Sequence, residues 1–395
     1  MPQTNKSAKV EIGVLYGFRA LMILFVMNYH LWQQSWIPQA VRVGRRYISL
    51  DFWTRSSYLF VDGMILMSGF LLYLPWARAK LEGAQEPSVR RFYFNRAVRI
   101  LPSYLFAVFA ALLLIAVPQG LYPSAAAMLK DVFAHLTFTF LFSPSTYLTT
   151  PLNMALWTIA VEVQFYLIFP LLVRAMKKHA GLTAGVMMLT AWLYRFAVSR
   201  LAQEPAMFIN QMPAFLDVYA IGMLMAAGWV RFSRWLRTFS RGERAAVQAV
   251  STAVFAAAGW MLTVILKVQS ASGSAGHHAM NLSQMAVRLP LAVTFALMMF
   301  TASFWPRFLQ KLLDNRLMRF LSVISMNLYI WHQVLAVQMR MAWFPDTGLL
   351  HTDRNLQAAY MLLCISVAVL AAKAVTFGLE QPFSRWANKY IQIKE

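Results

Sequence analysis

The chain has 395 residues, of which 59% are hydrophobic and only 13% are charged, and its formal net charge is +21. Soluble domains have about a quarter of their residues charged, so this composition excludes an ordinary soluble protein and indicates one that crosses a membrane several times. The basic residues form short clusters between apolar runs, which excludes nucleic acid as the expected partner. The single cysteine, Cys364, excludes an intramolecular disulfide and a cysteine metal cluster.

Ten apolar runs are long enough to cross a bilayer core of about 30 Å as helices. They cover residues 13–32, 57–76, 98–117, 154–174, 182–200, 212–230, 246–267, 286–304, 319–340 and 357–379. An eleventh run, from Val132 to Phe142, is too short to cross and is predicted to be a re-entrant or interfacial helix. The predicted fold class is therefore all-α, a polytopic membrane bundle of about ten transmembrane helices.

The distribution of Lys and Arg predicts the orientation of this bundle. If the N-terminus is cytoplasmic, about two thirds of the 36 Lys and Arg residues fall in cytoplasmic segments, as the positive-inside rule requires. We therefore expect cytoplasmic tails at 1–12 and 381–395 around a membrane domain at 13–380, in the plasma (inner) membrane. The first outer loop is an exception because it contains four arginines. These either bind an anionic group outside or are simply tolerated: Arg42, Arg45, Arg46 and Arg55.

Arg19 and His30 lie inside the first predicted span. Their separation corresponds to about three helical turns, which places both side chains on one face, about 16 Å apart along the axis. An ionisable residue within a span is costly to insert and normally faces a bundle interior or a water-filled cavity. The first span therefore presents a polar stripe that we interpret as functional.

Other ionisable residues fall within the later spans. Four of them lie in the outer half or near the midplane of the predicted bundle: Asp62, Glu162, Asp217 and His332. Arg96 and Arg99 instead stand at the cytoplasmic end of the third span. Three residues apart, they share a helix face and can bind phosphates through their forked donors. This separation suits an anionic donor that enters from the cytoplasm and a reaction placed further out.

Six segments, spread over about 13–383, resemble the acyltransferase-3 family of integral membrane O-acyltransferases. They are FRALMILFVMNYH, VDGMILMSGF, RAVRILPSY, LWTIAVEVQFYLIFP, ISMNLYIWH and LEQPF. The resemblance implies an enzyme that takes an acyl group, most simply acetyl, from cytoplasmic acyl-coenzyme A. It implies transfer of that group to a hydroxyl of a cell-surface or envelope glycan or glycolipid. Acyl-coenzyme A is then a substrate, and no metal or permanently bound cofactor is expected.

The resemblance also implies roles for individual residues. His30 is the expected general base that takes the proton of the attacking hydroxyl, and an acyl-histidine intermediate stays open. Glu162 either orients this imidazole or is a charge partner of Arg19 or of a group in the ninth span. Arg19 either holds the donor or steadies the oxyanion, or it is a charge partner of Asp62 or Glu162.

Arg96 and Arg99 are the expected sites for the phosphates of coenzyme A. Asp62, Asp217 and His332 are expected to line a pore or the acceptor site. Ser68 precedes Gly69 inside a span, and such a small-residue step is more typical of close helix packing than of a nucleophile. Two other functions stay open from the sequence: acylation of a small molecule such as a macrolide sugar, and transport of a polysaccharide or organic anion along the polar stripe.

Overall fold

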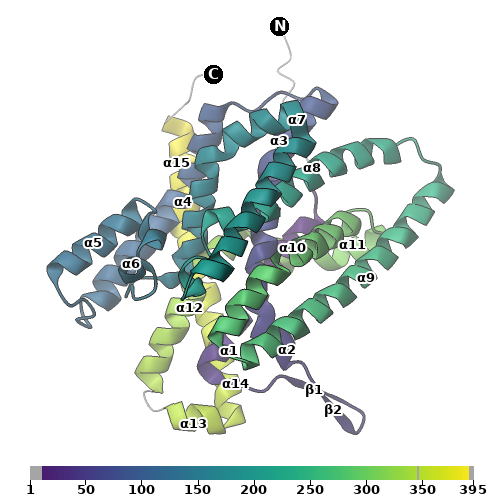
Figure 1. Cartoon of the computed structure of the whole chain (residues 1–395). Helices are drawn as coiled ribbons and strands as arrows, with labels where there is room; N and C mark the ends of the chain where they lie inside the picture. The colour runs from purple at the N-terminus through teal and green to yellow at the C-terminus, as the bar shows by residue number, and fades with distance from the viewer. Residues whose placement is uncertain (1–10, 345–346, 391–395) are drawn as a thin grey trace.

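A computed structural model describes residues 11–344 and 347–390. These residues form a helical bundle with one short β-hairpin (Figure 1), which confirms the predicted fold class. Residues 1–10 and 391–395 of the predicted tails lie outside the described residues, and Gln381–Tyr390 of the second tail forms a helix, α15. In Figure 1, α15 lies at one end of the bundle and the hairpin with α13 lies at the other.

Nine segments of the described chain are long and apolar enough to cross a membrane. They are built on the helices α1 (Val14–Ser35), α3 (Phe60–Glu82), α4 (Val89–Ala111), α7 (Trp157–Leu201), α8 (Leu216–Leu236), α9 (Arg241–Ser274), α10 (His277–Ala302), α12 (Arg316–Trp343) and α14 (Arg354–Val375).

Shorter elements connect or extend these helices. The α-helices are α2 (Asp51–Ser56), α5 (Ala125–Leu136), α6 (Pro144–Tyr147), α11 (Arg307–Leu313) and α13 (Thr347–Thr352). The 3-10 turns are η1 (Ser57–Leu59), η3 (Phe140–Phe142), η4 (Met154–Leu156), η5 (Pro205–Met207) and η6 (Met212–Phe215), and two π-helical turns are η2 (Leu112–Ala116) and η7 (Thr376–Glu380).

Helix α7 reverses direction within its length. His179 has φ −142° and ψ 74°, which no helix accommodates. At one end of α7, the ring of Trp157 stacks on Phe215 at 6.0 Å, and near the other end Arg195 Nη1 donates to Ala214 O at 2.7 Å. Both ends therefore approach the same turn, and each arm, residues 157–178 or 180–201, is about 33 Å long. Nine apolar segments thus contain the ten predicted crossings.

The predicted interfacial helix begins earlier than expected. The apolar run predicted this helix at Val132 to Phe142, whereas α5 covers Ala125–Leu136 and a 3-10 turn follows at Phe140–Phe142. The apolar run predicted only the later half of α5. The first turn was not predicted because it consists of alanines that follow the capping Ser124. At about 18 Å, α5 is too short to cross a bilayer, and in Figure 1 it projects to the side of the bundle with α6.

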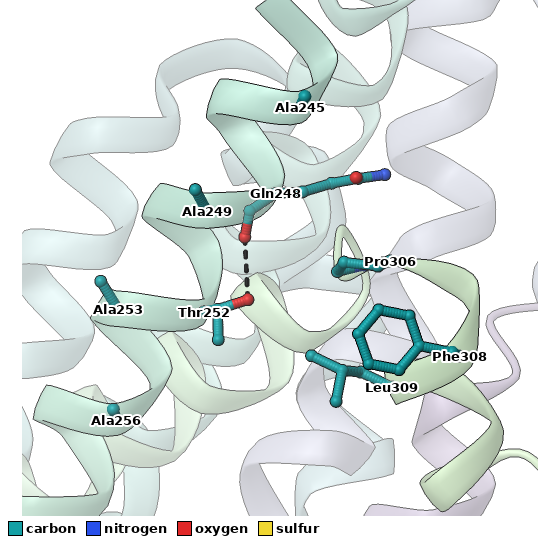
Figure 2. A pocket seen from close by; sticks show the side chains of 9 residues that line it. All are labelled: Ala245, Gln248, Ala249, Thr252, Ala253, Ala256, Pro306, Phe308 and Leu309. Atoms are coloured by element: carbon teal, nitrogen blue, oxygen red, sulfur yellow. Dashed lines mark hydrogen bonds between the residues drawn. The ribbon is translucent and has the colours of Figure 1, made fainter.

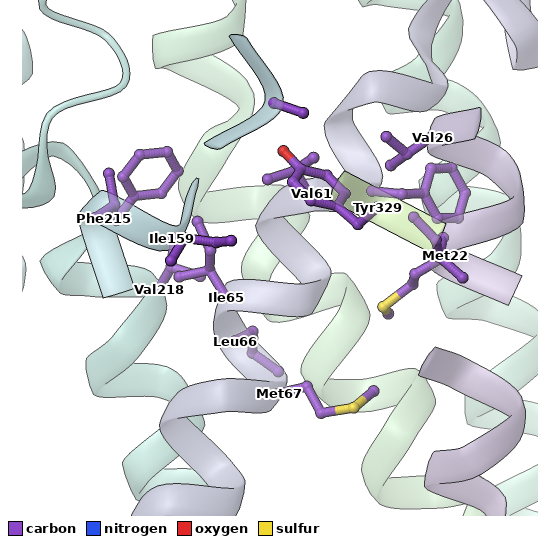
Figure 3. Packing of buried hydrophobic residues seen from close by; sticks show 14 of the residues in the cluster. Met22, Val26, Val61, Ile65, Leu66, Met67, Ile159, Phe215, Val218 and Tyr329 are labelled. Atoms are coloured by element: carbon purple, nitrogen blue, oxygen red, sulfur yellow. The ribbon is translucent and has the colours of Figure 1, made fainter. Parts of the chain in front are cut away.

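The core lies where α1, α3, α7, α8 and α12 meet, and Figure 3 shows residues from all five helices interdigitating. The closest approach is between α3 and α8. A Cβ atom built on Gly69 would lie 2.8 Å from Tyr219 O. This confirms that the step at Gly69 serves close helix packing.

The first outer loop forms an antiparallel hairpin, β1 (Ala40–Val43) with β2 (Arg46–Ser49), paired Ala40↔Ser49 and Val43↔Arg46 at its ends. Every residue of both strands is exposed. The hairpin carries three of the four arginines of this loop, and the guanidinium of the fourth, Arg55, lies 5.4 Å from the centre of the Trp32 ring.

Candidate active site

Two histidines from distant parts of the chain face each other. The ring centroids of His30 on α1 and His332 on α12 are 5.2 Å apart. His332 is buried, and its Nδ1 lies 2.7 Å from Tyr329 O and 3.1 Å from Leu328 O. A carbonyl oxygen can only accept, so Nδ1 carries the proton and Nε2 carries the lone pair. That Nε2 is buried and has no hydrogen-bond partner among the described residues.

A hydrogen bond at Nδ1 likewise fixes the ring of His30. Its Nδ1 lies 2.9 Å from Gln33 Oε1, while Gln33 Nε2 donates to the hydroxyl of Tyr29 at 2.9 Å. The amide oxygen of Gln33 therefore accepts the Nδ1 proton of His30, and Nε2 of His30 keeps its lone pair. In its neutral form each imidazole therefore holds its lone pair at Nε2, and His30 is the less buried of the two.

Glu162 does not contact His30 through a hydrogen bond. Its two carboxylate oxygens accept from Ser68 Oγ at 2.6 Å and from Tyr166 OH at 2.7 Å. Gln33 is the side chain that contacts Nδ1 of His30, and the expected orienting role of Glu162 is not found as a direct hydrogen bond. Sequence reasoning missed Gln33, although its position three residues after His30 puts it on the same helix face.

Three arginines, Arg19, Arg96 and Arg99, gather near Glu162. Along α1 they are at a distance from the histidine pair. Arg19 of α1 lies within electrostatic range of Arg99 and Glu162, and Tyr166 lies within range of both Arg96 and Arg99. None of the three guanidinium groups forms an ion pair or a hydrogen bond with another described residue, and Nε of Arg96 is buried without a partner. The alternative of Arg19 as a direct ion-pair partner of Asp62 or Glu162 is therefore not found.

Glu380 stands near this arginine cluster and was not assigned a role from the sequence. Its carboxylate accepts from Asn327 Nδ2 at 2.8 Å, and the same nitrogen donates to Thr376 Oγ1 at 2.8 Å. Glu380 ends the π-helical turn Thr376–Glu380, and such turns occur frequently at functional sites. It also lies within electrostatic range of Arg19 and Arg99.

Tyr329 lies between the arginine cluster and the histidine pair. Its ring centroid is 5.7 Å from that of His332, and its hydroxyl interacts with Thr158 and lies within electrostatic range of Glu162. Asn327 and His332 lie on the same helix, α12. Helix α12 therefore carries both the partner of Glu380 and one member of the histidine pair.

Asp62 and Asp217 do not line a pore, which corrects the prediction from the sequence. Both carboxylates are buried and paired: Asp62 Oδ2 with Arg288 Nε at 3.0 Å, and Asp217 with both terminal nitrogens of Arg195 at 2.6 and 2.9 Å. Buried carboxylates need such counter-charges. The sequence offers no sign of these pairings, because Arg195 and Arg288 lie on α7 and α10, far along the chain from the acids that they contact.

Arg288 also anchors the turn before α8. Its Nη1 donates to Ile209 O at 2.8 Å, and its guanidinium lies 3.9 Å from the centre of the Phe215 ring. Together with the bond from Arg195 to Ala214 O, this fixes residues 209–217 against α3 and α10. These four charged residues therefore have a structural role.

A cavity of about 560 Å³ lies elsewhere, between α9 and α11, and Figure 2 shows its mostly apolar lining. The one hydrogen bond drawn there joins Thr252 Oγ1 to Gln248 O at 2.9 Å. This cavity has no charged lining residue, so it does not match an anionic donor. Among the described residues, no group of three or more His, Cys, Asp or Glu side chains is placed to hold a metal ion.

Comparison with known proteins assigns the family. The acyltransferase-3 family, described as an acyltransferase domain, matches residues 14–376. The chain belongs to the acyltransferase-3 family. It is also 25% identical over 183 residues to a peptidoglycan O-acetyltransferase of Listeria monocytogenes, and this match covers 43% of the chain and 25% of the relative. No solved structure matches the chain.

The family assignment makes the chain an acyltransferase, in agreement with the resemblance found in its motifs. It favours an enzyme over the transporter considered from the sequence. All of the histidine pair, Glu162 and the arginine cluster fall within the matched residues.

Proposed function

We propose that this protein transfers an acyl group, most simply acetyl, from acyl-coenzyme A to a hydroxyl of a cell-envelope glycan. The observation that carries the proposal is the cluster of Arg19, Arg96 and Arg99, which has no ion-pair partner among the described residues and adjoins a chain of polar groups leading to two neutral imidazoles. Uncompensated arginines bind phosphates well through bidentate hydrogen bonds.

The donor occupies the bundle lengthwise in this mechanism. Its phosphates bind Arg96 and Arg99, and its thioester reaches toward His30, about 16 Å from Arg19 along α1. Such a reach suits a long, thin arm that ends in a thioester. Acyl-coenzyme A is consumed as a substrate, and the proposed chemistry needs no permanently bound cofactor.

The transfer itself uses the lone pair at Nε2 of His30. Nε2 takes the proton of the acceptor hydroxyl while the hydroxyl oxygen attacks the thioester carbonyl carbon. The carbon–sulfur bond then breaks, and the departing thiolate receives the proton from His30. Gln33 holds the ring so that Nε2 faces this reaction. The same lone pair can instead attack the thioester first and form an acyl-histidine intermediate, with the acceptor attacking in a second step.

The proposed acceptor rests on the similarity to a peptidoglycan O-acetyltransferase. A glycan in the envelope presents hydroxyls at the membrane surface, beside the end of α1 that carries His30. A small molecule such as a macrolide sugar offers the same hydroxyl chemistry and is the alternative acceptor. Membranes supplied with acetyl-labelled donor distinguish these two acceptors. Base-labile label should appear in the isolated glycan if the acceptor is a glycan and in the soluble fraction if it is a small molecule.

The donor experiment uses purified protein in nanodiscs with labelled acetyl-coenzyme A and no acceptor. We expect wild type to bind and slowly hydrolyse the donor, Arg96→Ala/Arg99→Ala to lose at least tenfold in affinity, and His30→Ala to bind normally without turnover. Arg90→Ala is the matched control, because Arg90 is an exposed arginine on the same helix. Equal binding by wild type and the double variant contradicts the donor site.

A further inference from the structure

A cavity of about 530 Å³ lies where the two arms of α7 meet at His179. It is distinct from the proposed active site, whose residues do not line it. Its lining residues come from both arms: Leu172, Arg174, Ala175, Lys178, His179, Leu182, Thr183, Val186 and Met187. The reversal of α7 therefore creates a cleft between two membrane-crossing arms.

The lining of this cleft has a basic part at one end and an apolar part along the arms. Arg174, Lys178 and His179 cluster at the bend, and none of the lining residues in the described chain is acidic. Arg174 and Lys178 are exposed and form no ion pair with a described carboxylate, whereas the neighbouring Lys177 is already paired with Glu86 at 2.5 Å. The basic end therefore keeps two positive charges that no described carboxylate compensates.

The apolar part of the lining lies along the facing sides of the two arms. Leu172 lies on the first arm, and Leu182 and Val186 lie on the second, where their side chains are exposed. In a membrane these surfaces meet lipid acyl chains, while the bend lies at the headgroup level because each arm is just long enough to cross. Basic pockets between membrane helices at this level are suited to anionic lipid headgroups.

We propose that this cleft binds an anionic phospholipid, with its phosphate on Arg174 and Lys178 and an acyl chain along Leu172, Leu182 and Val186. The lipid then joins the two arms of α7, one of which carries Glu162 and the other Arg195. Bound lipid stabilises the hairpin that presents Glu162 to the arginine cluster. This inference is independent of the proposed acyl transfer, because none of its residues contacts the donor or acceptor.

Native mass spectrometry of the detergent-purified protein tests this site with phosphatidylglycerol, phosphatidylcholine and inorganic phosphate as probes. We expect retained phosphatidylglycerol on wild type, at least tenfold less on Arg174→Gln/Lys178→Gln, and little of the other two probes. Val186→Trp fills the apolar part and keeps the charges, so it is also expected to lose the lipid. Thermal unfolding without added lipid checks that each variant is folded.

Arg307→Gln/Lys311→Gln is the matched control, since it removes two exposed basic residues of α11 outside the cleft. It should retain phosphatidylglycerol as wild type does. Equal loss in this control, equal retention of phosphatidylcholine, or inorganic phosphate binding as strongly as the lipid would each overturn the proposal. The last result would identify a free-phosphate site instead.

Discussion

The imidazole rings of His30 and His332 lie 5.2 Å apart, and each ring has its Nδ1 committed to an oxygen acceptor, from Gln33 in one case and from the backbone of α12 in the other. Two basic Nε2 atoms therefore occupy one small region of the bundle. When His30 takes a proton, His332 is the neutral imidazole beside the new positive charge.

Substitution of His332 tests whether this second imidazole assists the reaction. We expect His332→Gln to lower kcat by about 10²- to 10³-fold, within the range of about 10² to 10⁴ typical of general acid–base contributions, with little change in the KM for acetyl-coenzyme A. Steady-state kinetics in nanodiscs measure both constants. His278→Gln, which changes an exposed histidine at the start of α10, should leave both unchanged. A KM effect alone would mean that His332 only shapes the donor site.

Gln33 is expected to position His30 rather than to react. Gln33→Leu removes the acceptor of the Nδ1 proton, so the ring is free to rotate and kcat should fall about tenfold or more. Gln33→Glu keeps an acceptor oxygen at that place and should restore most of the activity. Donor binding, measured separately, should be the same in both variants. Equal activity of Gln33→Leu and wild type would contradict the assignment.

The pair Asp62 and Arg288 is expected to govern stability. Removing one partner leaves a buried, uncompensated charge and costs about 3–5 kcal/mol, so Asp62→Leu and Arg288→Met should each lower the thermal unfolding midpoint strongly. The double variant Asp62→Leu/Arg288→Met removes both charges and should recover much of the loss. Thermal unfolding in detergent measures this cycle, and a double variant as unstable as the sum of the singles would argue against direct pairing.

Gly69 and Gly259 offer a matched comparison of helix packing. A Cβ atom at Gly69 meets the Tyr219 carbonyl oxygen, whereas one at Gly259 meets no atom within 4 Å. Gly69→Ala should therefore lower stability by about 1–3 kcal/mol through overpacking. Gly259→Ala should be neutral or slightly stabilising, because alanine favours the helix. The order of the two unfolding midpoints checks the contact between α3 and α8.

Local patterns in the sequence predicted the helices well, because a run of apolar residues long enough to cross a bilayer allows few other structures. They also indicated that Arg96 and Arg99 share one helix face, and the assignment of these two arginines and Arg19 to a donor site stays a prediction. These inferences needed only composition, spacing and the cost of burying charge.

The contacts between helices distant in the sequence could not be predicted from local patterns. Nothing in the run around His332 indicates that α12 packs beside α1, so the histidine pair appeared only in the structure. Arg195 and Arg288 looked like ordinary charges at span ends, and their pairing with Asp217 and Asp62 depends on how α7 and α10 dock against α8 and α3. Gln33 was overlooked because an uncharged amide gives no electrostatic signal.

The reversal of α7 at His179 determines the parity of the whole topology. A continuous segment that goes in and returns contributes an even number of crossings, so the connection before Met154 and the connection after Leu201 lie on the same side of the membrane. Counting α7 as one crossing would invert every later helix and would exchange the sides assigned to α10, α12 and α14. Reporter tags placed in the 148–153 and 202–204 connections should therefore be labelled from the same side.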